Sequence, residues 1–557
     1  MPNSSQSSSE PSSPSSDSSA SSQPGVAQSA RPAHPINTDI AVLAELSGAR
    51  LDWLHVEWMG AATAVDVVSG VDLRAQGIVP GDLFAALPGA RSHGAEFAGD
   101  ALARGAAAIL TDEAGLGVLR ASAPKIDRPV RILVHPKPRD VLGEISAEIY
   151  GRPSEKMQVI GITGTSGKTT TSYLLEAALA GAGRKPGLVG TIETRIDGRH
   201  VPSALTTPEA PQLHALFAVM AEQGIDTVVM EVSSHALSLG RVDGIRFDIG
   251  AFTNLSQDHL DFHRDFEEYF EAKARLFDPQ STVRADRSVI CVDDVWGRRM
   301  AELVSADALT TVSTSESDAD WNVGSVEVAV DGSQTFDLMG PDGQSSPVSL
   351  RLPGRYNVAN AALALTICVA ADIDLSAAVA AVGVVDVPGR VQRIDRGQGF
   401  LAVVDYAHKP AALEAVIATL RNQVSGRVGV VVGAGGDRDS GKRALMGEAS
   451  ARGSDLLIVT DDNPRTEVPA TIRAAVMAGA LAVPESERGV VLEVGDRAEA
   501  IEQAVRWAQP GDVVLVAGKG HETGQEIDGV KHPFDDREVL GEMIDRIVVN
   551  TAHGGKK

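Results

Sequence analysis

The chain has 557 residues, of which 50 are Lys or Arg and 74 are Asp or Glu, so its net charge at pH 7 is −24 with His neutral. At about 100–200 residues per domain, this length predicts about three domains. The acidic excess argues against a broad nucleic-acid-binding surface, because phosphate backbones bind Lys and Arg, but it does not exclude local pockets for small anions. The two cysteines, Cys291 and Cys368, exclude a disulfide framework and a four-cysteine zinc site.

The N-terminal residues 1–36 are rich in Ser and Pro and are predicted to form a disordered tail. This segment has no basic region followed by an apolar run, so it does not resemble a secretory signal. Nowhere in the sequence do about 18 apolar residues follow one another, which predicts that no helix spans a membrane.

The remaining sequence is expected to form three α/β domains: a small N-terminal one, a central ATPase-like one and a C-terminal Rossmann-like one, at 37–152, 153–388 and 389–557. In the first of these, Pro80 and Gly81 predict a turn that precedes a strand. Residues 97–112 predict a helix that stops at Gly105, followed by another strand.

In the central domain, apolar runs alternate with helical segments, which predicts a mostly parallel, doubly wound sheet. The expected strands begin at Met157 and continue with the runs at 227–234, 248–256 and 288–294. Residues 318–352 are polar and alternating, and they predict antiparallel hairpins.

The C-terminal domain contains five apolar runs that each end in polar or Gly residues, at 400–407, 427–436, 455–464, 490–496 and 512–521. Ligands of open α/β sheets bind beyond the carboxyl ends of the strands. The polar residues that follow these runs are therefore candidates for a binding site.

Residues 161–170, GITGTSGKTT, connect an apolar strand to a helix. A Gly-rich turn at that position points backbone N–H groups at a phosphate, at the positive end of the helix dipole. Lys168 is placed to reach the β- and γ-phosphates, and the Thr169 hydroxyl is placed to bind Mg²⁺. The loop departs from the strict pattern, because Ile162 stands where the first Gly belongs. We interpret it as a site for ATP or a close relative.

Acidic residues and histidines follow two further strands. Glu231 ends one of them, where a carboxylate can hold a metal, although an acidic strand end is also often merely solvated. Asp258, His259, Asp261 and His263 fall within six positions, a density that suits metal or phosphate chemistry. Magnesium is favoured over zinc, because a nucleotide site implies a hard, oxygen-preferring ion.

Ten motifs then occur in a fixed order, and together they resemble the Mur ligase family, specifically the enzymes that add the third amino acid of the peptidoglycan peptide. The resemblance runs from about residue 70 to about residue 540. The motifs are TGTSGKTT, EVSSHAL, TNLSQDHLDFH, EAKARLF, GRYNVANAALA, VPGRVQ, VDYAHKP, GAGGDRDSGKR, TDDNPRTE and GKGHE.

The resemblance implies a three-domain enzyme of peptidoglycan precursor synthesis, with Mg²⁺ as cofactor and ATP as co-substrate. It would add meso-2,6-diaminopimelate to UDP-N-acetylmuramoyl-L-alanyl-D-glutamate through an acyl phosphate, by positioning and charge neutralisation. We expect a monomer in the cytoplasm, whose partners are these small molecules and not nucleic acid.

The resemblance also assigns the nucleotide and metal residues. Lys168, Glu231, His259 and Lys273 would be catalytic, with Lys273 carbamylated. Metal ligands would be Thr169, Glu231, His259 and Lys273. Without the resemblance, Lys273 is typical of a solvated helix face. The residues assigned to ATP are Gly164, Thr165, Ser166, Gly167, Lys168, Thr169, Thr170, Asn357, Asn360, Arg390, Asp405 and His408.

The residues assigned to the UDP-substrate are Arg74, Ser92, Thr206, Thr207, Ser233 and Arg241. This part departs from the family pattern. Leu73 stands where an Asp-Ser-Arg element has its Ser, and Leu239 stands where a glutamine is common. These departures concern the details of uridine binding and not the reaction.

The residues assigned to diaminopimelate are Arg438, Asp462, Asn463, Pro464, Arg465, Gly518 and Glu522. In the family, the sequence Asp-Asn-Pro-Arg accompanies diaminopimelate and not lysine. Diaminopimelate has a second carboxylate, which the guanidinium of Arg465 can hold in a bidentate fork. Lysine would leave this arginine without its anion, which disfavours lysine as a substrate.

Two alternatives remain at this point. A folylpolyglutamate synthase-like ligase shares the phosphate-binding loop and the modified lysine, but it does not predict Asp-Asn-Pro-Arg or the N-terminal domain. A catalytically silent nucleotide-binding regulator predicts loss of Lys168, Glu231, His259 or Lys273, and all four are present.

Overall fold

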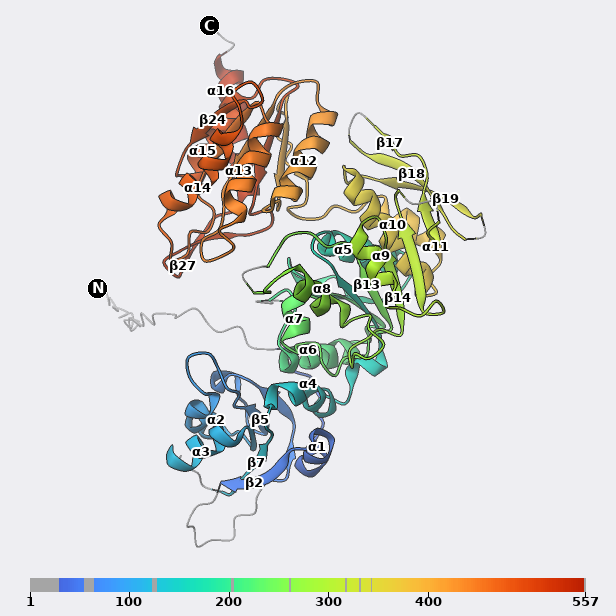
Figure 1. Cartoon of the computed structure of the whole chain (residues 1–557), viewed down its shortest axis with the longest axis vertical. Helices are drawn as coiled ribbons and strands as arrows, with labels where there is room; N and C mark the ends of the chain where they lie inside the picture. Colours follow the sequence, from blue (N-terminus) through green and yellow to red (C-terminus); the bar gives the residue numbers. More distant parts are fainter. Residues whose placement is uncertain are drawn as a thin grey trace, which may run out of the picture.

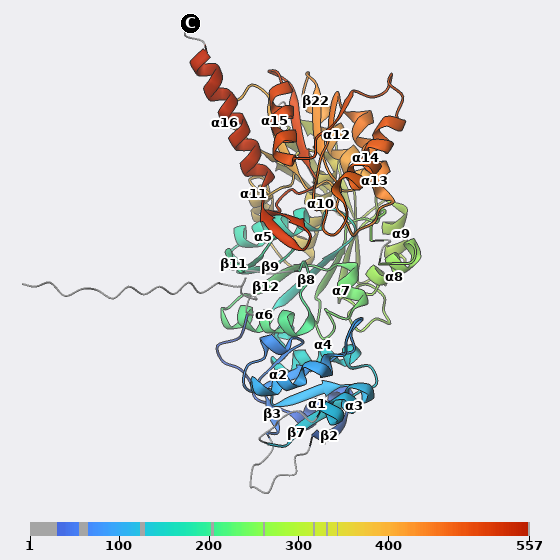
Figure 2. The ribbon, with the colours of Figure 1, turned by 90° about the vertical axis from the view of Figure 1, so that its left-hand side faces the viewer.

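The computed structural model describes residues 30–54, 65–122, 128–201, 205–259, 262–315, 318–329, 332–341 and 343–554. Figure 1 shows three α/β units stacked along the long axis, with the N-terminal unit at the bottom and the C-terminal unit at the top. The view in Figure 2 shows the same order and places helix α16 (Asp536–Gly554) along the outside of the C-terminal unit. The predicted architecture of three α/β units is thereby confirmed.

A five-stranded sheet forms the centre of the N-terminal unit, in the order β2 (Arg50–Leu54), β7 (Val130–Val134), β6 (Ala108–Thr111), β5 (Asp82–Ala85) and β4 (Gly70–Asp72). The strands are parallel except β2, which runs antiparallel to β7. Its helices are α1 (Ile40–Ser47), α2 (Ala98–Ala103), α3 (Glu113–Ser122) and α4 (Pro138–Ile149). Gly81, with φ +96°, precedes β5, and Gly105, with φ +98°, separates α2 from β6, which confirms the turn and the helix stop predicted there.

Arg31, Ala33 and His34 form hydrogen bonds in the structure, although they lie inside the predicted disordered tail of residues 1–36. The Arg31 guanidinium donates to both carboxylate oxygens of Asp82 at 2.8 Å. The backbone N–H groups of Ala33 and His34 donate to the Glu222 carboxylate of the middle unit at 2.7 and 2.8 Å. These contacts lie within the predicted tail, and no periodic pattern in the sequence marks them. The domain limit at residue 37 stays a prediction. The rest of the predicted tail, residues 1–29, lies outside the described residues.

The middle unit is built on a twelve-stranded sheet. The neighbours β9, β12, β8, β13, β14, β15 and β16 are all parallel, which confirms the predicted parallel sheet, and β17, β18 and β19 form the antiparallel hairpins expected over 318–352. The strand order is β11 (Arg199–Val201), β10 (Thr194–Ile196), β9 (Pro186–Val189), β12 (Thr227–Glu231), β8 (Gln158–Thr163), β13 (Ile249–Phe252), β14 (Arg287–Cys291), β15 (Leu309–Ser313), β16 (Trp321–Val323), β18 (Gln334–Met339) and β17 (Glu327–Val328), with β19 (Ser345–Leu350) on β18.

Helices cover both faces of this sheet and bury two separate apolar cores. One core is formed with α5 (Lys168–Gly181), α10 (Arg355–Ala370) and α11 (Leu375–Val382). The other is formed with α6 (Ala210–Glu222), α7 (Ser234–Ser238), α8 (Phe266–Ala274) and α9 (Val295–Ala301). The central strands are therefore buried on both sides, which explains why they appear in the sequence as continuous apolar runs.

The C-terminal unit has a six-stranded sheet, and all five predicted strands are present in it. The order is β20 (Gln392–Arg393), β21 (Leu401–Asp405), β25 (Val513–Ala517), β22 (Val428–Val432), β23 (Leu456–Val459) and β24 (Val490–Glu493), parallel except for β20. Its further elements are α12 (Pro410–Gln423), α13 (Lys442–Gly453), α14 (Pro469–Ala482), α15 (Arg497–Trp507) and the hairpin β26 (Gly524–Ile527) and β27 (Val530–Pro533). The carboxyl ends of β21, β25, β22 and β23 therefore lie side by side.

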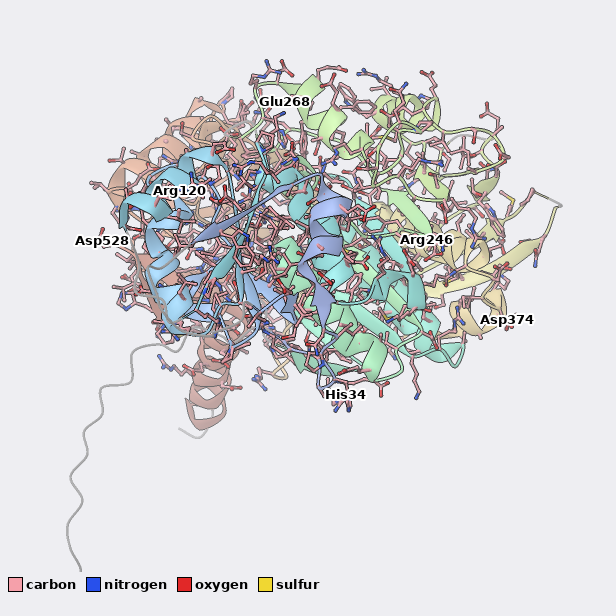
Figure 3. All side chains as sticks on the ribbon, turned by 90° about the horizontal axis from the view of Figure 1, so that it is seen from below. His34, Arg120, Arg246, Glu268, Asp374 and Asp528 are labelled. Carbon is pink, nitrogen blue, oxygen red and sulfur yellow. The ribbon has the colours of Figure 1, made fainter. Side chains whose placement is uncertain are left out.

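Charged side chains occupy the outside of the molecule. Figure 3, seen from below the view of Figure 1, labels Arg246 and Asp374, and both side chains are exposed. Among the described residues, none of the helices combines the length and the apolar character that crossing a membrane requires.

Candidate active site

A cleft of about 800 Å³ lies between the middle and C-terminal units. Most residues predicted to bind the nucleotide or the metal line it: Thr165, Ser166, Gly167, Lys168, Thr169, Thr170, Glu231, His259, Asn357, Asn360, Arg390, Asp405 and His408. Of the residues predicted for the UDP-substrate, Thr206 and Ser233 also line it. Widely separated motifs therefore meet in one place.

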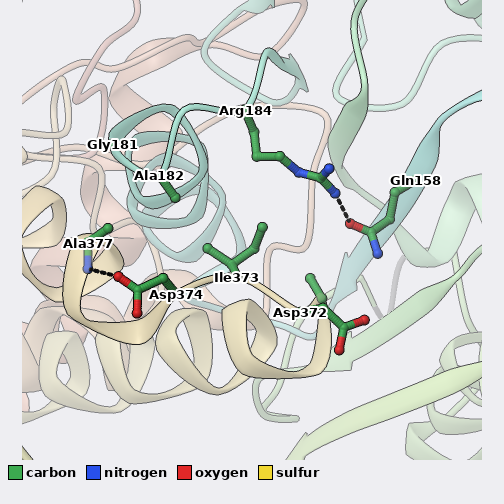
Figure 4. Close-up of a pocket in the computed structure, with 9 residues that line it drawn as sticks. Gln158, Gly181, Ala182, Arg184, Asp372, Ile373, Asp374 and Ala377 are labelled. Carbon is green, nitrogen blue, oxygen red and sulfur yellow. Dashed lines mark hydrogen bonds between the residues drawn. The ribbon is translucent and has the colours of Figure 1, made fainter.

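A second hollow, of about 490 Å³, lies between the end of α5 and the start of α11. Figure 4 shows Arg184 donating to Gln158 there, and Asp374 accepting from the Ala377 backbone at the start of α11. None of the ten motifs contributes to its lining. The cleft between the two units is the candidate active site.

The phosphate-binding loop joins β8 to α5, and its glycines are required by their geometry. Gly164 has φ +141° and Gly167 has φ +89°, in the region that side chains rarely adopt. A Cβ on Gly164 would lie 1.9 Å from Thr253 Oγ1, and a Cβ on Gly167 would lie 2.3 Å from Asn360 Oδ1. Lys168 Nζ donates to Gly164 O at 2.8 Å and Thr165 O at 3.1 Å, so this lysine folds back onto its own loop.

Glu231 ends β12, directly beside β8, and the residue is 1% exposed. It accepts from Thr169 Oγ1 at 3.1 Å, and from the Thr191 backbone N–H and Oγ1 at 2.8 and 2.9 Å. All of these donors are neutral, and no Lys, Arg or His forms an ion pair with Glu231 in the described part of the chain. A buried carboxylate with a hydroxyl beside it suits a hard cation such as Mg²⁺.

Lys273, on α8, is fully buried, and its Nζ donates to Gly164 O at 2.9 Å and lies 4.5 Å from the centre of the Tyr269 ring. Burial, with the ammonium groups of Lys168 and Lys409 nearby, lowers the pKa of Lys273 well below its usual value. A neutral amine is the form that can attack CO₂, so the environment suits the predicted carbamate.

His259 lies at the edge of the cleft, in the left-handed region with φ +55°. Its Nε2 is 3.0 Å from Asp258 Oδ2, and its ring meets the His235 ring edge-on at 4.8 Å. Burial lowers the pKa of His259 to about 3. His263 turns to Ser234 Oγ at 3.0 Å, and Asp261 lies outside the described residues.

The C-terminal unit contributes Arg390, whose Nη2 donates to Thr169 Oγ1 at 3.3 Å and whose guanidinium lies 4.3 Å from the centre of the Tyr406 ring. Asp405 uses both carboxylate oxygens on the backbone, accepting from Val391 N and Ala407 N at 2.7 Å each. Burial raises the pKa of this carboxyl. Asp405 therefore shapes the loop that carries Arg390.

Three other residues that are predicted to bind the nucleotide, Asn357, Asn360 and His408, form hydrogen bonds with neighbouring groups of the protein. Asn357 Nδ2 donates to Pro353 O at 2.8 Å, and Asn360 Nδ2 donates to Asn357 Oδ1 at 3.1 Å, so the two amides are oriented as a pair. His408 Nδ1 lies 2.8 Å from Tyr406 O.

The residues predicted for the UDP-substrate fall into two groups. Thr207 Oγ1 donates to Glu231 O at 2.9 Å and accepts from Ser233 N at 3.2 Å, while Arg241 Nη1 donates to Thr207 O at 3.4 Å. Together with Thr206, these form one cluster beside the metal candidate.

The second group, Arg74 and Ser92, lies in the N-terminal unit. Arg74 Nε is 3.5 Å from Asp72 Oδ1. The same oxygen accepts from Gln212, on α6 of the middle unit, at 3.0 Å. Arg74 therefore lies close to the contact between the N-terminal and middle units.

The residues predicted for diaminopimelate lie at the carboxyl ends of the C-terminal strands. Arg465 Nη1 donates to Gly436 O at 2.5 Å, and Arg465 Nε lies 3.4 Å from Glu526 Oε2. A Cβ on Gly435 would be 3.1 Å from Arg465 Nη1 and 3.9 Å from Arg438 Cγ. The two predicted arginines therefore approach each other over Gly435.

Asn463 occupies the centre of the same region. Its Nδ2 donates to Glu522 Oε2 at 2.8 Å, and its Oδ1 accepts from the buried Lys519 Nζ at 3.1 Å. Asp462 Oδ2 lies 2.7 Å from the position a Cβ would take on Gly518. The sequence segments around 433–443, 460–467 and 518–522 are thus packed together.

Comparisons with known proteins agree with this geometry. Three family models match: the Mur ligase family catalytic domain at 67–150, the Mur ligase middle domain at 162–368, and the glutamate ligase domain of Mur ligases at 389–520. The chain is 58% identical over 480 residues to the UDP-N-acetylmuramoyl-L-alanyl-D-glutamate--2,6-diaminopimelate ligase of Corynebacterium glutamicum, covering 86% of this chain and 92% of that protein. The chain belongs to the Mur ligase family.

Two further relatives of this Mur ligase carry the same name. The protein of Streptomyces coelicolor is 48% identical over 514 residues, which covers 92% of this chain and 98% of that protein. A solved structure of a UDP-N-acetylmuramoyl-L-alanyl-D-glutamate--2,6-diaminopimelate ligase is 33% identical, with a TM-score of 0.62 over 92% of this chain and 100% of that chain. The resemblance inferred from the ten motifs is confirmed.

Three residues of this Mur ligase site were not predicted: Thr191, Lys409 and Lys519. Thr191 follows Gly190 at the end of β9, and its signal was the Gly-Thr pair after an apolar run. Lys409 lies in the motif VDYAHKP and Lys519 lies in GKGHE, where only neighbouring residues were assigned a role. Their positive charge is the feature of the sequence that could have marked them as site residues.

Proposed function

We propose that this Mur ligase joins 2,6-diaminopimelate to UDP-N-acetylmuramoyl-L-alanyl-D-glutamate with the hydrolysis of ATP to ADP and phosphate. A carboxylate oxygen of the D-glutamate attacks the γ-phosphorus, and ADP leaves. The amine of diaminopimelate then attacks the carbonyl carbon of the acyl phosphate, phosphate leaves, and the new amide nitrogen loses a proton. Each step depends on positioning and on neutralising phosphate charge.

One observation carries the proposal: the phosphate-binding loop and Glu231 line one cleft into which the C-terminal unit directs Arg390. Lys273 does not line the cleft; it is buried against the loop, with its Nζ on Gly164 O. The relatives that are 48–58% identical over most of their length bear the name of this reaction. A folylpolyglutamate synthase-like reaction is disfavoured, because the chain contains the N-terminal unit matched at 67–150 and the Asp-Asn-Pro-Arg sequence.

Magnesium fits the oxygen donors of Thr169 and Glu231, whose carboxylate has only neutral donors in the described chain. Bound there, Mg²⁺ would neutralise phosphate charge. His259 and a carbamylated Lys273 are proposed for a second ion. The carbamate forms when the Lys273 amine adds to CO₂ and releases a proton, and the resulting anion would lie among the ammonium groups of Lys168 and Lys409.

The remaining roles follow the same logic. Thr206, Thr207, Ser233 and Arg241 would hold the peptide end of the UDP-substrate, with Arg74 and Ser92 on the uridine side. Arg465, with Arg438, would bind the distal carboxylate of diaminopimelate, and Gly518 and Glu522 would hold its distal ammonium group and backbone. We propose domain limits of 37–152, 153–388 and 389–557.

Measuring ADP release tests this function. Continuous ADP release should require the UDP-muramoyl dipeptide, diaminopimelate and Mg²⁺ together, because without diaminopimelate the reaction stops at the acyl phosphate. ADP release with a folate and glutamate would support the alternative ligase, and no ADP release with either set would support a silent regulator. A monomer in the cytoplasm stays our expectation, and light scattering of the full chain would test the monomer.

A further inference from the structure

Lys409 is the residue before α12 in the C-terminal unit, and its side chain crosses to the middle unit. Its Nζ lies 2.7 Å from Asp258 Oδ2 and donates to Thr165 O at 3.3 Å. The side chains of Lys409 and Asp258 are 9% and 8% exposed. This buried pair directly joins the two units that form the cleft.

The ammonium group of Lys409 shares a partner with the lysine of the phosphate-binding loop. Thr165 O accepts from both Lys409 and Lys168, and Gly164 O accepts from both Lys168 and Lys273. The side-chain nitrogens of three lysines therefore gather on two carbonyl oxygens, and Lys168 and Lys409 carry the positive charge, because burial favours the neutral amine at Lys273. Within the described ranges, Asp258 is the one carboxylate at ion-pair distance from any of them. So much buried positive charge calls for a polyanion.

We propose that Lys409 is a further phosphate-binding residue, which the C-terminal unit delivers to the γ-phosphate of ATP. This inference rests on the proposed function. Lys168 approaches the phosphates from the middle unit, and Lys409 approaches the same loop carbonyl from the opposite unit. Asp258 holds Lys409 until the nucleotide arrives, and the flexible lysine side chain then moves to the phosphate.

Lys409 thereby links nucleotide occupancy to closure of the cleft. ATP offers a γ-phosphate to a cation on the opposite unit, whereas ADP does not. The contact persists while the γ-phosphoryl group is transferred to the carboxylate, and it stabilises the negative charge on the transferred group. A cation placed in this way acts as the arginine finger does in other phosphoryl-transfer enzymes.

The test compares the affinities of the full chain and its Lys409→Met variant for ADP and for AMP-PNP, a non-hydrolysed ATP analogue, in the presence of Mg²⁺. We expect the variant to lose about tenfold or more in affinity for AMP-PNP and less than about threefold for ADP. We expect kcat to fall about 100-fold, with the KM for diaminopimelate close to the parent value. Lys409→Arg keeps the charge and should recover part of the discrimination between the nucleotides.

Lys137→Met is the matched control, because Lys137 is an exposed lysine of the N-terminal unit that lies 4.0 Å from Asp140. Equal losses for ADP and AMP-PNP in Lys409→Met would overturn the proposal, since a merely structural role weakens both. Unchanged affinities would overturn it as well. If Lys409→Met lowers the unfolding temperature, Lys409→Gln is measured in its place.

The proposed function can fail separately from this inference. A parent chain that releases no ADP with the UDP-substrate and diaminopimelate would refute the proposed function, while the nucleotide affinities still decide the role of Lys409. A parent chain that is active, with a Lys409→Met variant that is equally active, would refute the inference alone.

Discussion

Replacing Arg465 with Ala should change the choice of amino acid more than it changes stability. The backbone of Arg465 is held independently of its side chain, because its N–H donates to Glu526 O at 3.0 Å and its carbonyl accepts from Asp528 N at 2.8 Å. Arg465 has φ +53°, a strained conformation that Ala would share with Arg. The substitution therefore removes side-chain contacts without altering the backbone of the loop.

The size of the effect follows from what the side chain contacts. Its ion pair with Glu526 is at 3.4 Å, and the two side chains are 23% and 44% exposed. Such a pair contributes about 0–1 kcal/mol, and the bond to Gly436 O about 1 kcal/mol, to the free energy of unfolding. A charge-assisted bond to the substrate carboxylate contributes about 1.5–3 kcal/mol, which corresponds to about 10- to 150-fold in affinity.

The assay is kcat/KM for diaminopimelate and for lysine, measured on the parent and on Arg465→Ala. We expect the KM for diaminopimelate to rise within that range, the KM values for ATP and the UDP-substrate to stay near the parent values, and lysine to remain a poor substrate. Arg452→Ala is a matched control, since Arg452 forms exposed ion pairs with Glu448 and Glu487 in the same unit. A parent that prefers lysine, or a variant that keeps the full preference for diaminopimelate, would refute the assigned role.

Three further predictions concern the modified lysine, closure and pH. Lys273→Ala should lose most activity, and acetate but not bicarbonate should restore part of it; a near-parent rate would exclude the carbamate. Small-angle scattering should show a smaller radius of gyration with an ATP analogue and UDP-substrate than without them, because the ligands would hold the two units in the arrangement in which Arg390 contacts the phosphate loop; an unchanged radius at saturation would contradict closure. His214 is fully buried with Nε2 3.0 Å from Asp243 O, and burial lowers its pKa to about 4. Since the unfolded chain binds this proton near pH 6.5, the free energy of unfolding should fall by about 3 kcal/mol from pH 6.5 to 4, and equilibrium unfolding of His214→Gln should lack this loss; the same pH dependence in both proteins would disprove it.

The parts of the site that lie on one strand–loop–helix unit were predictable from the sequence. Lys168 and Thr169 follow a strand and open a helix, so local geometry alone aims them at a phosphate. The position of Glu231 could be predicted from the rule that the carboxyl ends of parallel strands lie at one edge of the sheet. The same rule made the segments that contain Asp462 and Gly518 candidates for a binding site, and in the structure a Cβ on Gly518 would lie 2.7 Å from Asp462 Oδ2.

Contacts that depend on the pairing of distant segments were not predictable. Thr191 reaches Glu231 because β9 pairs with β12, and no spacing in the sequence specifies that neighbour. Lys409 reaches Asp258 across two units, at a separation of 151 residues by their numbers. The contacts of Arg31 were missed because a single arginine in a Pro- and Ala-rich run carries no periodic signal.

A chain of net charge −24 must still attract a triphosphate, and the structure shows how the two demands are compatible. Exposed carboxylates are screened beyond about 8–10 Å at physiological ionic strength, so the overall charge hardly reaches a ligand in the cleft. The buried ammonium groups of Lys168 and Lys409 act at hydrogen-bond distance in a less polar medium, where a unit charge contributes several-fold more than in water. Because these lysines come from different elements of two units, the cationic site is complete only when the units meet. The acidic exterior therefore does not weaken the site.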